Sequence, residues 1–341
     1  MSHALALEGV SHSFGKLEAL SRVDLHVEEG DIYGFLGLNG AGKTTAIRLV
    51  LGLVHHTSGE IRLLGAALRR PRPLEAYRKT GVLFEDFAAH EYLSGFDHLA
   101  LHARLLGMSR SDARSAAGLW LERVGIASKA REKIRGYSLG MKRRLGIACA
   151  LVGSPRIVIL DEPTNGLDPR GIADLRALVL ELNRRSGVTF FLSSHILGEV
   201  EQLCRTVGII HKGRMLAQGT VAELTGRGRQ RRKLRVAPIP RALELLRSAP
   251  WCRAVDEPPA PLPFGDRAEG DGAAAGDGAP RWLQAVVDGT DVPRMVRDLV
   301  AAGVDVHEVS EASESLEDVF HRTVIAAERE ETGLAAGGAG A

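Results

Sequence analysis

Short apolar runs with strand character alternate with amphipathic segments as far as about residue 219. The runs with strand character cover residues 4–10, 23–27, 31–36, 156–160, 189–193 and 207–211. Residues 91–150 are rich in Ala, Leu and Arg and have a mostly helical pattern. Strands interleaved with helices predict an α/β fold built on a mainly parallel sheet.

The composition changes after residue 225, and a second, smaller unit is predicted there. Its expected strands are residues 233–236, 252–255, 282–287 and 304–309, and its expected helices are residues 241–247 and 292–302. This βαββαβ order resembles a ferredoxin-like split βαβ unit. We therefore expect a small α+β C-terminal domain over residues 233–327.

The two expected domains are joined and flanked by segments of biased composition. Residues 226–232 form a basic run that is expected to be a linker between a first domain, residues 1–225, and the second. Residues 257–280 are dense in Pro, Gly, Ala and Asp, which predicts a disordered insertion. Residues 328–341 are expected to form a flexible tail.

Composition and charge narrow the class of protein. Of the 341 residues, 45% are hydrophobic and 25% charged, and the formal net charge is +2, so there is no global argument for a nucleic-acid partner and none is expected. The three cysteines are far apart and form no CxxC pair, which argues against a disulfide framework or a zinc knuckle. No segment approaches the roughly 18 unbroken apolar residues of a spanning helix, and the first ten residues lack the pattern of a signal peptide. A cytoplasmic protein is expected, brought to a membrane only by a partner.

The strongest chemical motif follows the expected strand at residues 31–36. It reads Gly37-Leu38-Asn39-Gly40-Ala41-Gly42-Lys43-Thr44, a full match to GxxxxGK[ST], and a helical pattern from Thr45 follows it. Such a loop curls its backbone N–H groups toward phosphate oxygens at a helix N-terminus. Lys43 supplies a positive charge to the β- and γ-phosphates, and the Thr44 hydroxyl is suited to Mg²⁺.

A second motif ends another buried strand in two carboxylates. Four consecutive apolar residues, 157–160, precede Asp161 and Glu162. The carboxyl end of a parallel strand is where α/β sheets place ligands. We expect Asp161 in the shell of a metal ion and Glu162 as the base that polarises a water for attack on the γ-phosphate.

These motifs, together with those that follow, make the chain resemble the nucleotide-binding subunit of an ATP-binding-cassette (ABC) transporter over roughly residues 4–222. Residues 137–142, Tyr-Ser-Leu-Gly-Met-Lys, stand where that family keeps its LSGGQ signature. Residues 165–168, Asn-Gly-Leu-Asp, match the D-loop, and His195 matches the switch histidine. Phe14 matches the aromatic residue that stacks on adenine.

The resemblance implies a P-loop ABC ATPase cassette with a parallel core sheet, an antiparallel β subdomain and an α-helical subdomain. It implies ATP and Mg²⁺ as ligands, and two cassettes that face head to tail, as a homodimer or a heterodimer. The residues it places at the nucleotide are Phe14, Gly37, Leu38, Asn39, Gly40, Ala41, Gly42, Lys43, Thr44, Thr45, Ser138, Gly140 and Asp168. Ser138 and Gly140 would act in trans on the nucleotide held by the other cassette, and His195 would sense its γ-phosphate.

Two departures from the family pattern bear on function. The signature reads SLGMK in place of SGGQ, although Ser138 and Gly140 are kept. The family's Q-loop glutamine is replaced by Glu85, which would serve as a catalytic-site acid and a third metal ligand beside Thr44 and Asp161. The alternative, that Glu85 is an exposed loop acid, stays open. This combination resembles the bacitracin-resistance and lantibiotic-immunity branch of the drug-resistance type of ABC-2 exporters.

The sequence thus predicts an ATPase subunit, peripheral on the cytoplasmic face of the cell membrane, that dimerises on ATP and drives a separate ABC-2 type permease. The expected cargo is an antibiotic, a peptide or a lipid-like molecule. A soluble ABC-type ATPase acting on nucleic acid or ribosomes is the alternative. Ribosome-associated members of the family carry two cassettes in one chain, and this chain has only one. DNA-repair members insert a long coiled coil between the phosphate loop and the signature, and the roughly ninety-five residues between Lys43 and Ser138 are too few for it. A catalytically inactive partner subunit is disfavoured because Glu162 and His195 are both present.

Overall fold

The computed structural model describes residues 3–69, 72–226, 231–256, 280–311 and 314–337. The chain divides into two units, and each is described by itself. The first unit comprises residues 1–221 together with 316–341, and the second comprises residues 222–315.

The first unit is built around a six-stranded sheet with the strand order β10-β9-β3-β8-β7-β6. Its strands are β3 (Ile32–Leu36), β6 (Thr80–Leu83), β7 (Ile157–Asp161), β8 (Thr189–Ser194), β9 (Thr206–His211) and β10 (Arg214–Thr220). Five of them are parallel, and only β10 at one edge is antiparallel to its neighbour. Every residue of β3, β7 and β8 is buried, as expected for strands covered on both faces.

A four-stranded antiparallel sheet of order β2-β1-β4-β5 completes the β structure of this unit. Its strands are β1 (His3–Phe14), β2 (Leu17–Glu28), β4 (Ser58–Leu63) and β5 (Ala66–Ala67). One apolar core joins the two sheets and helix α1 (Lys43–Val50), and it includes Leu25, Phe35, Ile47 and Phe191. The predicted combination of a parallel core sheet and an antiparallel β subdomain is confirmed.

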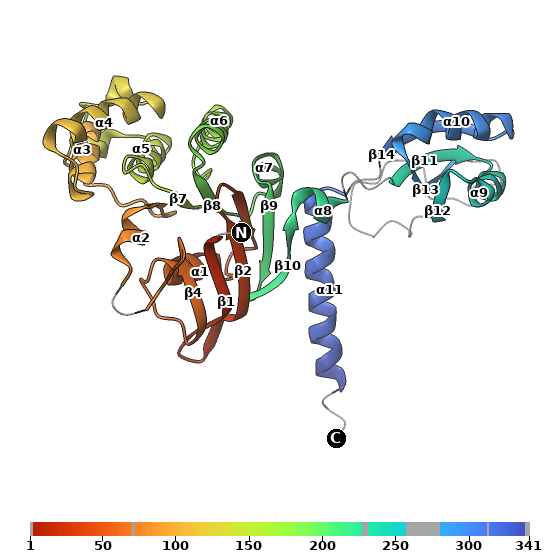
Figure 1. The fold of residues 1–341 in the computed structure, drawn as a ribbon, viewed down its shortest axis with the longest axis horizontal. Coiled ribbons are helices and arrows are strands. Elements are labelled where there is room, and N and C mark those ends of the chain that lie inside the picture. The colour runs from red at the N-terminus through yellow and green to blue at the C-terminus, as the bar shows by residue number, and fades with distance from the viewer. Residues whose placement is uncertain (1–2, 70–71, 227–230, 257–279, 312–313, 338–341) are drawn as a thin grey trace. The chain divides into compact units, whose positions relative to one another are not determined.

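The helices of the first unit include a cluster that lies apart from the antiparallel sheet in Figure 1. This cluster consists of α3 (Gly95–Leu105), α4 (Arg110–Arg123) and α5 (Leu139–Leu151). Each helix starts at a serine whose hydroxyl accepts an N–H three residues further on, at Ser94, Ser109 and Ser138. The other helices between residues 70 and 221 are α2 (Leu74–Arg78), α6 (Pro169–Ser186), α7 (Leu197–Leu203) and the 3₁₀ turns η1 (Ala127–Lys129) and η2 (Ile134–Gly136). Helix α8 (Val221–Thr225) begins at the boundary between the two units. The α-helical subdomain was predicted from the family resemblance.

The second unit has its elements in the predicted order, strand, helix, strand, strand, helix, strand. They are β11 (Arg231–Ala237), α9 (Ile239–Ser248), β12 (Cys252–Asp256), β13 (Arg281–Val287), η3 (Gly289–Asp291), α10 (Val292–Ala301) and β14 (Asp305–Glu311). The strands form one antiparallel sheet of order β12-β13-β11-β14, and a separate apolar core packs beneath it. The expected insertion at residues 257–280 lies outside the described residues except for residue 280.

Two of the expected boundaries differ in the structure. Strand β11 begins at Arg231, so the last two residues of the expected basic linker belong to the sheet, and residues 227–230 lie outside the described part. Helix α11 (Leu316–Gly337) groups with the first unit, although it was expected to be divided between the second domain and a flexible tail.

Helix α11 joins the first unit through a regular apolar face. Leu316, Val319, Phe320 and Val324, spaced as one face of a helix, are all buried. The helix contacts α7 and β10, and the Leu316 backbone N–H donates to Glu201 Oε2 on α7 at 3.0 Å. Burial of this stripe is the physical reason that the helix packs on the first unit. Among the described helices, none is both long enough and apolar enough to span a bilayer.

Candidate active site

The predicted site segments follow four adjacent parallel strands. In the sheet, β3, β8, β7 and β6 are consecutive neighbours. Leu36 pairs with Ser194, Asp161 pairs with Ser193, and Leu83 lies beside Leu160. The loops that begin after these residues therefore leave the same edge of the sheet side by side.

The phosphate loop after β3 depends on glycine for its shape. Gly40 and Gly42 have φ angles of 81° and 109°, in the left-handed region that other residues rarely adopt. A β-carbon on Gly37 would lie 2.6 Å from the carbonyl oxygen of Ile210, so a side chain does not fit there. The loop leads directly into the N-terminus of α1, whose first residue is Lys43. This is the arrangement that binds phosphate through backbone N–H groups.

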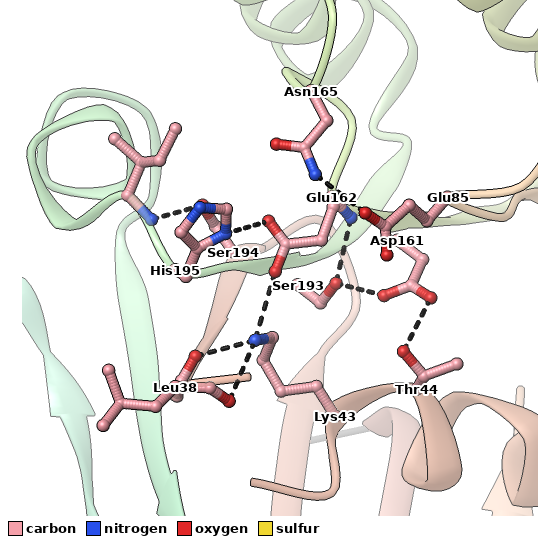
Figure 2. A network of polar contacts seen from close by, with 12 residues as sticks. Leu38, Lys43, Thr44, Glu85, Asp161, Glu162, Asn165, Ser193, Ser194 and His195 are labelled. Atoms are coloured by element: carbon pink, nitrogen blue, oxygen red, sulfur yellow. Dashed lines mark hydrogen bonds and ion pairs between the residues drawn. The ribbon is translucent and has the colours of Figure 1, made fainter. Parts of the chain in front are cut away.

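Lys43 is 6% exposed and points back into the loop, where its ammonium donates to the carbonyl oxygen of Gly37 at 2.7 Å. The same ammonium lies 3.1 Å from Oε1 of Glu162. The second carboxylate oxygen of Glu162, Oε2, lies 2.8 Å from Nδ1 of His195 (Figure 2). One buried carboxylate is thus held between a lysine and a histidine from two other segments.

The backbone of Glu162 has an uncommon conformation for a residue with a side chain. Its φ angle is 48°, and this left-handed conformation costs about 1–3 kcal/mol and persists only where the surroundings impose it. The N–H of Glu162 donates to the hydroxyl of Ser193 at 3.0 Å. Strand β8 therefore holds the residue that follows β7, and the turn aims the Glu162 side chain at Lys43 and His195.

Thr44 and Asp161 lie together beside this carboxylate. The Thr44 hydroxyl donates to Asp161 Oδ2 at 3.0 Å, and the hydroxyl of Ser193 donates to Asp161 Oδ1 (Figure 2). A hydroxyl and a carboxylate are hard oxygen ligands of the kind that Mg²⁺ accepts. The donor set therefore fits a magnesium ion beside a bound triphosphate.

Glu85 is exposed and follows β6. Its Oε1 accepts a hydrogen bond of 3.0 Å from the side-chain amide of Asn165, a residue of the predicted D-loop. The structure thus links the expected metal ligand to another site segment, while its role as a ligand stays a prediction. Asn165 was not among the predicted binding residues.

A buried arginine, Arg143, is a site residue that the sequence analysis missed. It lies on α5, is 3% exposed, and directs its guanidinium toward the backbone around Glu85 and Glu162. Burial lowers its pKa below the ordinary value, and the nearby carboxylates of Glu85, Asp161 and Glu162 oppose this effect. The available signal was a charged residue at the head of an otherwise apolar helical segment, residues 145–152.

The other predicted nucleotide contacts lie away from this cluster of side chains. Ser138 is the exposed N-cap of α5, and Gly140 is in its first turn. Asp168 caps α6 by accepting the N–H of Gly171 at 3.0 Å. Phe14, at the end of β1, is 47% exposed, and its ring lies edge-on to His12.

The remaining loop residues differ in exposure. Leu38, Asn39 and Gly40 are exposed at the crest of the loop, Ala41 is buried below it, and Thr45 is half-buried in the first turn of α1. The exposed loop crest leaves backbone groups accessible to a ligand.

Comparison with known proteins identifies the family. The family model described as "ABC transporter" matches residues 20–165. The bacitracin transport ATP-binding protein BcrA of Enterococcus faecalis is 37% identical over 250 residues, which are 73% of this chain and 80% of that protein. The uncharacterized ABC transporter ATP-binding protein YdbJ of Bacillus subtilis is 33% identical over 96% of this chain and 97% of its own. The chain belongs to the ABC transporter ATP-binding proteins.

A solved ATP-binding subunit of an ABC transporter supports the same assignment. It is 30% identical, has a TM-score of 0.61, and the match covers 66% of this chain and 93% of that one. The family resemblance, the ABC cassette fold and the ATPase class predicted from the motifs are confirmed. The similarity to YdbJ also covers the second unit of this ABC protein, because it spans 96% of the chain. The ferredoxin-like assignment of that unit stays a prediction.

Proposed function

We propose that this ABC protein is the ATP-hydrolysing subunit of an exporter, paired with a second cassette and driving a separate ABC-2 type permease. The observation that carries the proposal is the Glu162 carboxylate held between Lys43 and His195 at the mouth of a phosphate loop. The name of the relative BcrA, a bacitracin transport ATP-binding protein, supports an antibiotic or peptide cargo. The same name favours transport over the alternative of an ATPase acting on nucleic acid or ribosomes.

Charge competition at Lys43 gives the hydrolysis step a physical basis. The phosphate oxygens of ATP compete with Glu162 for the Lys43 ammonium, because a triphosphate carries more negative charge than one carboxylate. Glu162 Oε1 then becomes available to accept a proton from the attacking water, while His195 still holds Oε2. His195 would in turn sense the γ-phosphate.

The metal ion would be held by Thr44 and Asp161, with Glu85 as the third expected ligand. Mg²⁺ supplies charge neutralisation at the β- and γ-phosphate oxygens. Ser193 orients Asp161 through its hydroxyl, so that one carboxylate oxygen faces Thr44. Adenine would stack on the exposed ring of Phe14.

Pairing with a second cassette explains the exposed signature. Ser138 and Gly140 would reach the nucleotide of the other copy, and Asp168 would lie near the same interface. Leu139, between the two signature residues, is 68% exposed, and Leu38 in the phosphate loop is 51% exposed. Apolar side chains displayed at both expected contact loops are consistent with burial against a partner.

Hydrolysis is tested with the purified chain, MgATP and a phosphate-release assay. Glu162→Gln should bind ATP and hydrolyse it at least about 10²-fold more slowly, the usual scale for loss of a general base. ATP should also trap this variant as a dimer on gel filtration. Unchanged turnover in Glu162→Gln would remove Glu162 from its proposed role.

Export is tested in cells that carry the cognate permease. Deletion of the gene should sensitise them to bacitracin or to a lantibiotic, and the wild-type chain should restore resistance where Glu162→Gln does not. If the deletion strain keeps full resistance to both but ribosomes or nucleic acid stimulate the purified ATPase, the alternative function is the correct one.

A further inference from the structure

The guanidinium of Arg143 connects two parts of the site, the backbone of residues 161–163 and the backbone of residues 84–85. Its Nε donates to the carbonyl oxygen of Pro163 at 3.1 Å, and one terminal nitrogen donates to the carbonyl oxygens of Asp161, at 2.8 Å, and Glu162. The other terminal nitrogen donates to the carbonyl oxygens of Phe84 and Glu85, both at 2.9 Å.

These five contacts use all five N–H groups of the side chain. Three of them bind the consecutive carbonyl groups at residues 161–163, and two bind the consecutive carbonyl groups at residues 84–85. A planar fork with fixed donor directions can satisfy two such rows at once, whereas the three hydrogens of a lysine ammonium radiate from a single point. The geometry depends on the shape of the guanidinium as well as on its charge.

One of these carbonyl groups belongs to Glu162, the residue with the left-handed backbone. Its N–H is bound by Ser193 and its C=O by Arg143, so both sides of the strained residue are fixed. A left-handed residue with a side chain persists only where the surroundings impose it. Loss of one of the two anchors is expected to let the backbone relax and to turn the Glu162 side chain away from Lys43 and His195.

We propose that Arg143 is a positioning residue for ATP hydrolysis: its guanidinium fixes the backbone direction of Glu162 and ties it to the loop that carries Glu85. Arg143 makes none of its hydrogen bonds with the phosphate loop. It therefore affects kcat for hydrolysis and leaves the Kd for ATP unchanged. Because Glu85 lies in the loop between the site and the expected permease contact, the same side chain transmits a shift of that loop to Glu162.

The inference rests on the proposed role of Glu162 and is tested by a double-mutant cycle on the full-length chain. The variants are Arg143→Lys, Glu162→Gln and the double variant, and the measurements are kcat, KM and the Kd of a fluorescent ATP analogue. Arg144→Lys is the matched control: Arg144 is the next residue on α5 and binds Val124 and Asp174, outside both carbonyl rows.

We expect Arg143→Lys to lower kcat at least about tenfold, with the Kd of the analogue changed less than threefold. In the Glu162→Gln background the same substitution should change kcat less than twofold, because a residue that acts only through Glu162 has nothing left to position. Arg144→Lys should keep wild-type kcat. If Arg143→Lys does not fold, Arg143→Gln replaces it in the cycle.

Two results would overturn the inference. Wild-type kcat in Arg143→Lys would show that the guanidinium fork is not needed. Equal losses of kcat in the presence and absence of the Glu162 carboxylate would show that Arg143 does not act through Glu162. Failure of the proposed function has a different signature. It would appear as absent ATP turnover in the wild-type chain, or as unchanged turnover in Glu162→Gln when Arg143 is intact.

Discussion

The ammonium of Lys43 lies 3.1 Å from the carboxylate of Glu162, and both side chains are 6% exposed. Each charge offsets the cost of burying the other, so removal of one partner leaves an uncompensated buried ion. The ion pair also keeps the phosphate-binding cation and the proposed base in contact until a triphosphate competes for the cation. We therefore expect the stability of the fold and the proposed hydrolysis to be coupled through Lys43 Nζ and Glu162 Oε1.

The first prediction concerns this pair. Lys43→Met should abolish detectable ATP binding and lower the free energy of unfolding by up to about 3–5 kcal/mol, because Glu162 keeps a buried charge. Adding Glu162→Gln should restore most of the stability without restoring ATP binding. Chemical denaturation and titration with a fluorescent ATP analogue measure the two effects. Lys16→Met, at an exposed lysine, should change neither, and additive stability losses in the double variant would contradict the coupling.

The second prediction concerns the exposed acid that replaces the family's Q-loop glutamine. Glu85→Ala should leave the Kd for ATP within about tenfold, or roughly 1.4 kcal/mol, and abolish resistance in cells with the permease. Glu85→Gln should be milder, because its carbonyl oxygen still accepts the hydrogen bond from Asn165.

The hydrogen bond and the metal-ligand roles of Glu85 are separable. Asn165→Ala should reproduce the loss of resistance if the hydrogen bond to Asn165 carries the coupling, and it should leave the Mg²⁺ dependence of ATPase activity unchanged. Asp86→Ala, at the neighbouring exposed acid, is the control. Full resistance in Glu85→Ala at matched expression would mean that Glu85 is only a loop acid.

Some contacts of the site could be predicted from the sequence and others could not, depending on whether the residues lie at the ends of neighbouring strands. Asp161 ends a buried parallel strand, and Lys43, Glu162 and His195 follow such strands. The carboxyl ends of parallel strands meet at one edge of the sheet, so the proximity of these residues could be predicted. The contacts of Arg143 could not. Its carbonyl partners near residue 85 are 58 and 59 residues away, and main-chain acceptors leave no mark on residue type.

Helix α11 shows the same limit at the level of the fold. Its apolar spacing over residues 316–324 indicates one buried helical face, but no local feature says which unit covers that face. Its residues 316–327 were expected in the second domain and its later residues in a flexible tail, whereas the packing surface is on α7 and β10 of the first unit. Chain order alone was therefore insufficient to set the domain boundary.

The third prediction concerns acid stability and His98 on α3. Burial, together with the nearby His90 and His102, lowers the pKa of His98 to about 4 from its ordinary value of 6.5. In the unfolded chain the imidazole takes up its proton near pH 6.5, so between pH 6.5 and 4 the unfolded state binds more protons and stability falls as pH falls. His98→Gln should make that fall shallower, by at most about 1.4 kcal/mol per pH unit.

Urea denaturation at pH 7, 6, 5 and 4 measures this slope. His55→Gln, at an exposed histidine, is the control and should leave the slope unchanged. An identical pH dependence in His98→Gln and the wild-type chain would mean that His98 is not the group whose protonation opposes folding.

The fourth prediction tests the assignment of α11 to the first unit by comparing two deletions. A chain that ends at Gly226 loses the second unit and α11 together, and it exposes the surface of α7 and β10 that covers Phe320 and its apolar neighbours. Removal of residues 227–312 keeps α11. The cut ends can be closed with about four Gly or Ser residues, because the Glu314 N–H donates to the carbonyl oxygen of Thr225 at 3.0 Å.

The internal deletion should keep ATP binding and a melting temperature close to that of the full chain. The chain ending at Gly226 should be destabilised by several kcal/mol, since full burial of each of the four apolar side chains contributes up to about 1.5–3 kcal/mol. Phe320→Ala in the full chain should reproduce part of this loss, about 3–5 kcal/mol for a buried phenylalanine. Equal melting temperatures for the two deletions would place α11 outside the folded core of the first unit and restore a domain boundary near residue 225.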